Sequence, residues 1–130
     1  MTKSKKRKTK PTTISEKVFA HFLPLPNTEL FKLTVSAIAE KLGLTRNILT
    51  TTFKNETGHN LSDILENHKL LVFSVLILKP EYQKVPITAI LESFNLGRPD
   101  HFARRFKKFF PVTPSVYRQL RKKVQHRGHR

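Results

Sequence analysis

The chain has 130 residues, no cysteine and a formal net charge of +16. This length allows one domain or two very small ones, and the absence of cysteine excludes a disulfide framework and a thiolate metal site. Nine acidic residues and four glycines provide no paired-carboxylate site, nucleophilic triad or glycine-rich phosphate loop. The six histidines form no metal-binding constellation. We therefore expect no enzyme, no metal and no cofactor.

The sequence shows no sign of export or membrane insertion. The N-terminus is basic, but no apolar segment of a signal peptide follows it. The longest apolar run, residues 70–78, is too short to span a bilayer. We expect a soluble cytoplasmic protein.

Positive charge is concentrated at the two ends of the chain. Six cations lie in residues 1–10 and six in residues 118–130, and subtracting these twelve leaves +4 for the middle. Residues 1–13 are predicted to be a disordered basic arm and residues 122–130 a basic tail. Such segments attract polyanions without identifying a partner, and they equally fit solvated arms that only increase solubility.

The first half of the chain predicts a helix-turn-helix. Residues 15–22 read as a short amphipathic helix that the segment 23–26 ends, and a loop is expected up to about Leu33. Two capped helices, residues 34–42 and 45–57, then follow around a glycine turn. The expected N-caps of these helices are Thr34 and Thr45, and the expected terminating glycines are Gly43 and Gly58.

A long helix is predicted over residues 61–79. Asn60 is its expected N-cap, and Pro80 requires it to end. Its middle, LLVFSVLIL, is apolar almost all round, as is typical of a helix that is buried on every side. This helix would join the first helix-turn-helix to whatever follows.

The second half repeats the pattern of the first at a spacing of about 50 residues. The segment 87–94 forms an amphipathic helix, residues 95–97 a turn, and residues 99–110 a second helix. Asn95 takes the place of Gly43, since asparagine tolerates the left-handed conformation. Thr113 and Pro114 are the N-cap and first residue of a last helix.

The predicted fold is therefore all-α, with two helix-turn-helix subdomains joined by a long linker helix and about seven helices in total. We place the first unit at residues 14–59, the linker helix at 60–80 and the second unit at 81–121.

The most specific segments, IAEKLGLTRNILTTTFKNETG and HFARRFKKFFPVTPSVYR, resemble the DNA-binding domain of AraC/XylS-type transcription regulators. The second segment ends in the TPxxYR signature of that family, made here by Thr113, Pro114, Tyr117 and Arg118. The resemblance covers roughly residues 15–121, and the length is similar to the stand-alone form of the domain. It implies a regulator that reads double-stranded DNA through two reading helices in successive major-groove segments. It also implies RNA polymerase as a partner and a place at the nucleoid.

The outward stripe of the first reading helix lies opposite Leu49 and Phe53. The resemblance implies base-reading roles for Asn47, Thr50 and Thr51, and phosphate contacts suit Arg46 and Lys54. In the second reading helix the base-reading candidates are Arg98, His101 and Arg104, and the backbone candidates are Arg105, Lys107 and Lys108. Asp100 is expected to favour the helix N-terminus electrostatically.

The chain departs from the family pattern at several positions. Asn95 and Pro111 stand where the family usually has glycine, Ser74 replaces an alanine, and Lys69 replaces an arginine. Val72 and Val75 replace polar residues of the linker helix. They indicate either a dimer or partner surface, or a site that the N-terminal helix covers.

Two alternative functions remain open from the sequence. One is a non-specific nucleic-acid binder, nucleoid- or ribosome-associated, whose affinity comes from tail charge. The other is a protein-interaction module that uses the apolar linker helix.

Overall fold

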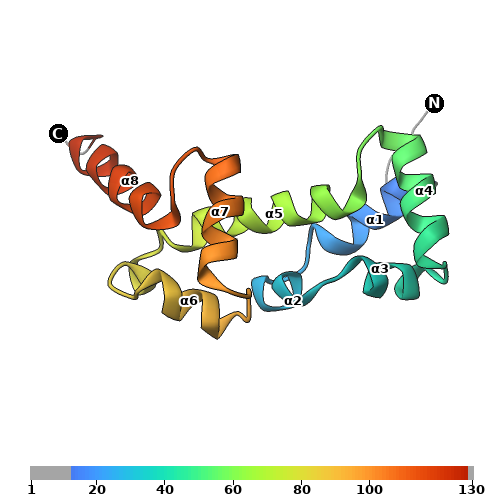
Figure 1. The fold of residues 1–130 in the computed structure, drawn as a ribbon, viewed down its shortest axis with the longest axis horizontal. Helices are drawn as coiled ribbons and strands as arrows, with labels where there is room; N and C mark the ends of the chain where they lie inside the picture. The colour runs from blue at the N-terminus through green and yellow to red at the C-terminus, as the bar shows by residue number, and fades with distance from the viewer. Residues whose placement is uncertain (1–12, 129–130) are drawn as a thin grey trace, which may run out of the picture. The chain divides into compact units, whose positions relative to one another are not determined.

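The computed structural model describes residues 13–128, with side chains up to residue 122 (Figure 1). These residues form eight α-helices and one short 3-10 helix and contain no strand, which confirms the all-α class. The predicted basic arm, apart from Thr13, and residues 129–130 lie outside this range. In chain order the helices are α1 (Ile14–Phe22), α2 (Asn27–Lys32), α3 (Val35–Leu42), α4 (Arg46–Thr57), α5 (Leu61–Leu76), η1 (Pro80–Tyr82), α6 (Ile87–Ser93), α7 (Pro99–Phe109) and α8 (Pro114–Gly128).

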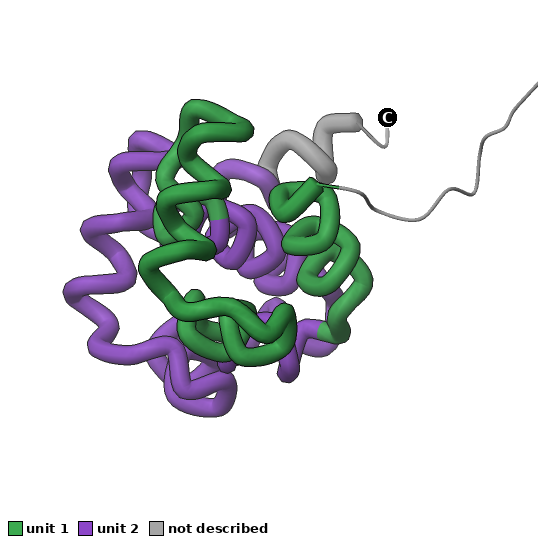
Figure 2. Tube along the Cα trace, turned by 90° about the vertical axis from the view of Figure 1, so that its right-hand side faces the viewer, with its two compact units in different colours: residues 1–26, 33–64 green, residues 27–32, 65–130 purple. Residues whose placement is uncertain are grey.

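The chain divides into two compact units (Figure 2). Unit 1 consists of residues 1–26 and 33–64, and unit 2 of residues 27–32 and 65–130. Each unit contains one helix-turn-helix, formed by α3 and α4 in unit 1 and by α6 and α7 in unit 2. We describe each unit by itself.

Unit 1 is held together by the mutual packing of α1, α3 and α4. Its core side chains Val18, Phe22, Ile38, Leu49 and Phe53 are at most 1% exposed. The Phe53 ring centroid lies 5.7 Å from that of Phe19, at an angle favourable for aromatic pairing. Burial of this apolar stripe fixes which face of α4 remains at the surface.

The predicted caps of unit 1 are confirmed. Thr34 and Thr45 each accept a hydrogen bond from the backbone N–H three residues later, at 3.1 Å. Gly43 and Gly58 end α3 and α4 in the left-handed conformation, with φ of 70° and 79°. These local signals set the start of α4 and the ends of α3 and α4.

The N-terminus of α1 is bound to the far end of α4. Glu56 accepts hydrogen bonds from the backbone N–H groups of Ser15 at 2.7 Å and Ile14 at 3.4 Å. The Ser15 bond, above all, holds the pKa of the Glu56 carboxyl below its ordinary value. Thr13 and Glu16 complete a capping box at the same helix end.

Unit 2 has an aromatic core built from α5, α6 and α7, with Phe31 of α2 included. The side chains of Phe73 and Phe106 are 0% exposed and Phe102 is 2% exposed. The Phe106 ring packs against Phe73 and Phe102, and Tyr117 of α8 meets it edge-on at 5.6 Å. The predicted core pair Phe102 and Phe106 is confirmed.

Helix α2 corrects the loop that was predicted to reach Leu33. Leu30 and Phe31 are 1% and 4% exposed, and the Phe31 ring meets Phe94 at 5.2 Å. A six-residue helix is too short to be stable by itself in water, so its formation depends on this burial. Because the stabilising contacts are distant in the sequence, the local pattern of this segment predicted a loop.

The linker helix α5 also ends earlier than predicted, at Leu76 rather than Lys79. Leu78 and Lys79 donate to carbonyls three residues back, which tightens the chain into the turn that precedes η1. Lys79 is extended, with ψ of 145°, because Pro80 disfavours the helical conformation in the residue before it.

Two turns in unit 2 have left-handed backbone. Asn95 has φ of 56° and Gly97 has φ of 89°, so the predicted left-handed role of Asn95 is confirmed. Pro111 has φ of 23°, far from the value of about −65° that its ring prefers. The family glycine at this position would remove that strain.

Helix α8 is fixed to the segment before α6 by Arg118. Its Nη1 donates to the carbonyl oxygens of Tyr82 at 2.9 Å and Val85 at 2.8 Å. Thr113 caps α8 as predicted, accepting from the Val116 N–H at 3.3 Å. In the TPxxYR signature of this chain, Arg118 therefore has a structural partner.

Candidate nucleic-acid interface

The surface face of α4 contains the side chains predicted to read DNA in unit 1. Arg46, Asn47, Thr51 and Lys54 are exposed, and Thr50 is half-buried. Because Leu49 and Phe53 point into the core, these polar groups lie on the opposite side of the helix. This face has two cations, at its ends, and neutral hydrogen-bonding groups between them.

Two of these side chains already have partners within unit 1. Arg46 Nη1 donates to Ser36 Oγ at 3.0 Å, so the guanidinium is directed along α3. The Thr50 hydroxyl donates to the Asn47 carbonyl oxygen at 3.3 Å, which leaves its methyl group and its acceptor capacity for a ligand. Asn47 and Thr51 have no side-chain hydrogen bond among the residues described.

Ile48 is a surface residue of α4 that the sequence analysis missed. Its side chain is 51% exposed, although isoleucine is usually buried. It lies beside Asn47 and three residues before Thr51, on the edge of the same face. An apolar group there suits contact with a thymine methyl group. Ile48 does not share the four-residue spacing of the core residues Leu49 and Phe53, and this could have indicated from the sequence that it lies at the surface.

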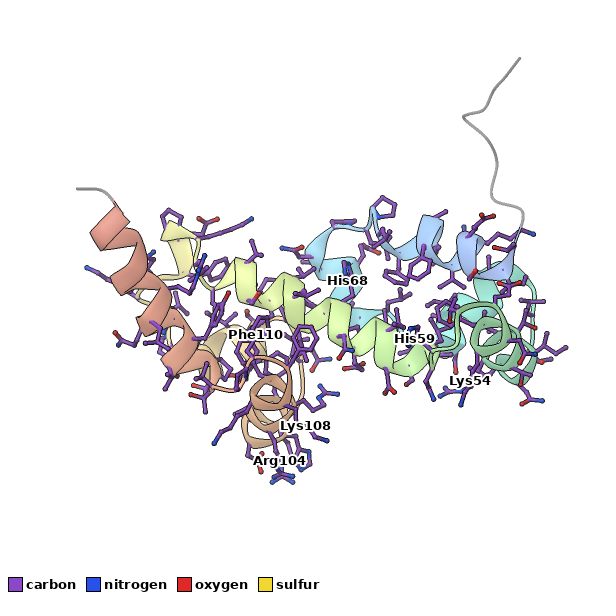
Figure 3. The ribbon with its side chains drawn as sticks, turned by 90° about the horizontal axis from the view of Figure 1, so that it is seen from above. Lys54, His59, His68, Arg104, Lys108 and Phe110 are labelled. Atoms are coloured by element: carbon purple, nitrogen blue, oxygen red, sulfur yellow. The ribbon has the colours of Figure 1, made fainter. Side chains whose placement is uncertain are left out.

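The face of α7 is more strongly charged. His101, Arg104, Lys107 and Lys108 are all exposed. Arg104 makes no ion pair or hydrogen bond with any residue in the described range. Figure 3 shows Arg104 and Lys108 projecting outward from α7, whereas Phe110 lies toward α5. The four-residue spacing of Arg104 and Lys108 places both on one face.

Arg98 precedes the reading helix instead of lying on its face. It is the N-cap residue of α7, and its Nη2 pairs with Asp100 Oδ2 at 3.1 Å. Partial burial raises the pKa of the Asp100 carboxyl, but the Arg98 charge and backbone N–H bonds outweigh this effect, and the pKa lies below its ordinary value. Asp100 thus stays ionised at the positive end of the helix.

An open hollow of about 490 Å³ runs along the same side of α7. Phe102 and the turn residues Leu96 and Gly97 line it together with cationic side chains and an imidazole. Its polar lining residues are Arg98, His101, Arg104, Arg105 and Lys108.

Arg105 differs from its neighbour Arg104 because it is paired. Its Nη1 lies 2.8 Å from Glu66 Oε1 of α5, and Glu66 Oε2 lies 3.7 Å from Lys69 Nζ. Burial lowers the pKa of the Lys69 ammonium, and the Glu66 carboxylate opposes that shift. Nothing in the local sequence pattern around Glu66 indicates a partner 39 positions later, so Glu66 is absent from the predicted site residues.

The two valines of the linker helix have different environments. Val72 is half-buried and packs against the unit 2 core. Val75 is 61% exposed, and Leu71, one turn earlier, is 46% exposed. The exposed ridge therefore consists of Leu71 and Val75, and Val72 contributes to the core instead.

The described part of the chain contains no group of three or more His, Asp or Glu side chains arranged to hold a metal ion. Across residues 13–128, no helix combines the length and the apolar character needed to cross a membrane.

Known proteins share this arrangement. A family model described as a helix-turn-helix domain matches residues 38–120. The multiple antibiotic resistance protein MarA of Escherichia coli K12 is 28% identical over 86 residues, which cover 66% of this chain and 65% of MarA. The transposon Tn10 TetD protein of Escherichia coli is 31% identical over 87 residues, covering 67% and 61%. The chain thus spans just under two thirds of the length of these relatives.

A solved structure supports the same relationship. The C-terminal domain of the two-component response regulator YesN from Fusobacterium nucleatum superposes with a TM-score of 0.57 at 25% identity. The match covers 81% of this chain and 93% of that domain. With a family match over more than half of its length and the two helix-turn-helix units described above, the chain belongs to the AraC/XylS family of helix-turn-helix DNA-binding domains.

Proposed function

We propose that the protein is a sequence-specific transcription regulator that binds double-stranded DNA through α4 and α7. The observation that carries this proposal is the repetition of one design: each unit buries two apolar side chains of a reading helix and leaves a polar face at the surface. The helix α4 of unit 1 and the helix α7 of unit 2 would each enter one of two successive major-groove segments, which lie about 34 Å apart. The family consists of DNA-binding regulators and not of enzymes, in agreement with the absence of catalytic motifs from the sequence.

In unit 1 we assign base reading to Asn47, Thr50 and Thr51, with Ile48 added from its exposure. Asparagine can pair with N6 and N7 of adenine, and the threonine methyl groups and Ile48 suit thymine. Arg46 and Lys54, at the ends of the exposed face, would contact phosphates and set the register of the helix.

In unit 2 we assign the main base contact to Arg104. An unpaired guanidinium can donate two parallel hydrogen bonds to O6 and N7 of guanine. His101 would read an adjacent position, and Arg98 would reach the bases or backbone at the start of α7. Lys107 and Lys108 would neutralise phosphates.

The proposed partners are DNA and RNA polymerase in the cytoplasm, at the nucleoid. The ridge of Leu71 and Val75 on α5 is an additional candidate contact for a second copy or a partner protein.

Selection of binding sites from random DNA tests the proposal. We expect a recovered motif with two separated half-sites, bound about 10³-fold more tightly than random DNA at physiological salt. An Arg104→Ala variant should lose the preference at one position, and a Lys122→Ala variant serves as the matched loss of a surface cation. Equal recovery of all sequences by the native protein would refute sequence-specific reading.

The uneven charge supports a second candidate, a non-specific nucleic-acid binder. Residues 1–10 carry six cations, a large part of the net charge of +16. We predict that their deletion weakens binding to selected and random DNA by the same factor and lowers the salt slope. Loss of affinity for the selected site alone would instead show that the arm reads bases.

A further inference from the structure

The acidic side chain of Glu66 connects the linker helix α5 to α7 through an ion pair. Glu66 uses both carboxylate oxygens: Oε1 lies 2.8 Å from Arg105 Nη1, and Oε2 lies 3.7 Å from Lys69 Nζ. The Arg105 and Glu66 side chains are 48% and 36% exposed, whereas that of Lys69 is 11% exposed. The Glu66 carboxylate therefore forms ion pairs with one cation at the surface and with one cation that is largely buried.

This trio has a fixed setting inside unit 2. It lines a hollow of about 270 Å³, together with Phe102 and the turn at residues 95–97 that leads into α7. Removing Glu66 would take a carboxylate away from a largely buried ammonium, which is costly. Lys69 thereby helps to hold the Glu66 carboxylate in place beside Arg105, independently of any ligand.

The geometry of α7 separates its two adjacent arginines. At 3.6 residues per turn, Arg105 is rotated by a little more than a quarter turn from Arg104. Arg104 shares the outward face with Lys108, while Arg105 is turned toward Glu66 on α5. The two guanidinium groups thus have the same chemistry and different freedom to meet DNA.

We propose that Glu66 is a counter-charge that keeps Arg105 from the DNA backbone and so positions α7 to contact DNA through Arg104. The inference rests on the DNA binding proposed above. It replaces the expected phosphate contact of Arg105 with a positioning role. Because a phosphate contact strengthens binding to every sequence alike, its suppression lowers the affinity for selected and random DNA by the same factor, and discrimination is left to the base contacts of Arg104.

A double-mutant cycle tests the coupling. Binding of Glu66→Gln, Arg105→Ala and the double variant to random and selected duplexes is measured by fluorescence anisotropy from 50 to 200 mM salt. Glu66→Gln should bind random DNA about tenfold more tightly at 50 mM salt, and its salt slope should steepen by about 0.9. Arg105→Ala should change binding less than about twofold in the native background, and should abolish the gain in the Glu66→Gln background.

Glu92→Gln on α6 is the matched control, since it removes an exposed acid of the same unit. It should give a much smaller rise in affinity and no dependence on Arg105. A Glu66→Gln, Lys69→Met variant repeats the test without the buried ammonium, in case Glu66→Gln alone fails to fold.

Two outcomes overturn the inference: Arg105→Ala weakens binding equally in both backgrounds, or Glu66→Gln behaves like Glu92→Gln. If either outcome is observed while the native protein binds DNA, the proposed function still stands and only the inference about Glu66 fails. A native protein that binds no DNA removes the proposed function and the inference with it.

Discussion

The two reading faces share one scaffold and differ in chemistry. The face of α4 offers Asn47, Thr51 and Ile48 between two flanking cations, whereas the face of α7 is made of His101, arginine and lysine. Neutral groups act over the length of a hydrogen bond or a methyl contact, while cations also act over the Debye length of about 8–10 Å. If both faces bind DNA as proposed, unit 2 would supply attraction as well as base reading, and unit 1 would contribute mainly base reading.

The largest expected effect comes from the equivalent core residues beneath the two faces. Phe53→Ala and Phe106→Ala should each lower the free energy of unfolding by about 3–5 kcal/mol, because both side chains are 0% exposed. Hydrogen exchange should show the loss of protection mainly in the unit that carries the change. Equal loss in both units for both variants would show that the units do not act as separate cores.

The next prediction separates base reading from attraction. Arg104→Ala should weaken binding to the selected site by about 1–3 kcal/mol and relax one position of the motif. Lys108→Ala should weaken binding to all sequences and reduce the salt slope by about 0.9. Asn47→Ala in unit 1 should relax one position without changing the slope. A slope that falls as much for Asn47→Ala as for Lys108→Ala would contradict the division of roles.

A pH-dependent contact distinguishes unit 1. Glu56→Gln should lower the denaturation midpoint at pH 7, because a neutral amide accepts more weakly from the N–H groups of Ser15 and Ile14. The folded-state pKa of Glu56 lies below its ordinary value of 4.5, so this stabilisation is complete above about that pH and is lost as pH falls through the folded-state pKa. Denaturation at pH 7, 5 and 3 should show the variant and native curves converging. A constant difference would show that the carboxylate charge is not involved.

The smallest effect concerns a strained turn in unit 2. Pro111→Gly should raise the free energy of unfolding by about 1 kcal/mol, because relief of the positive φ outweighs the extra chain entropy of glycine. Gly97→Ala is the opposite control, since alanine at φ of 89° introduces strain. Thermal unfolding of both variants provides the measurement. A lower melting temperature for Pro111→Gly would mean that proline entropy is the stronger effect.

The features that sequence reasoning predicted were local ones. Thr34, Thr45 and Gly43 act through hydrogen bonds and backbone angles within a few residues of themselves, so their roles follow from neighbouring letters. Ile48 was overlooked because an exposed apolar residue looks like a core residue in a sequence. The pair of Glu66 and Arg105 depends on how α7 packs against α5, and no local pattern records that packing.

The corrections to the fold have the same origin. Helix α2 forms because Leu30 and Phe31 are buried, Phe31 in the core of unit 2, and α5 ends early because Pro80 makes the preceding residue extended. Periodicity predicts where a helix can form, while the last turn of a helix and the existence of a very short helix depend on tertiary contacts and on neighbouring turns.

The place of α2 in the chain has a consequence for synthesis. Phe31 leaves the ribosome with the residues of unit 1, yet the core that it completes is finished only after Phe106 has been made. The core of unit 2 therefore combines a ring made early in synthesis with rings made late. A fragment starting at residue 65 would lack one of its own core rings, so the gene cannot be divided at the linker helix into two complete halves.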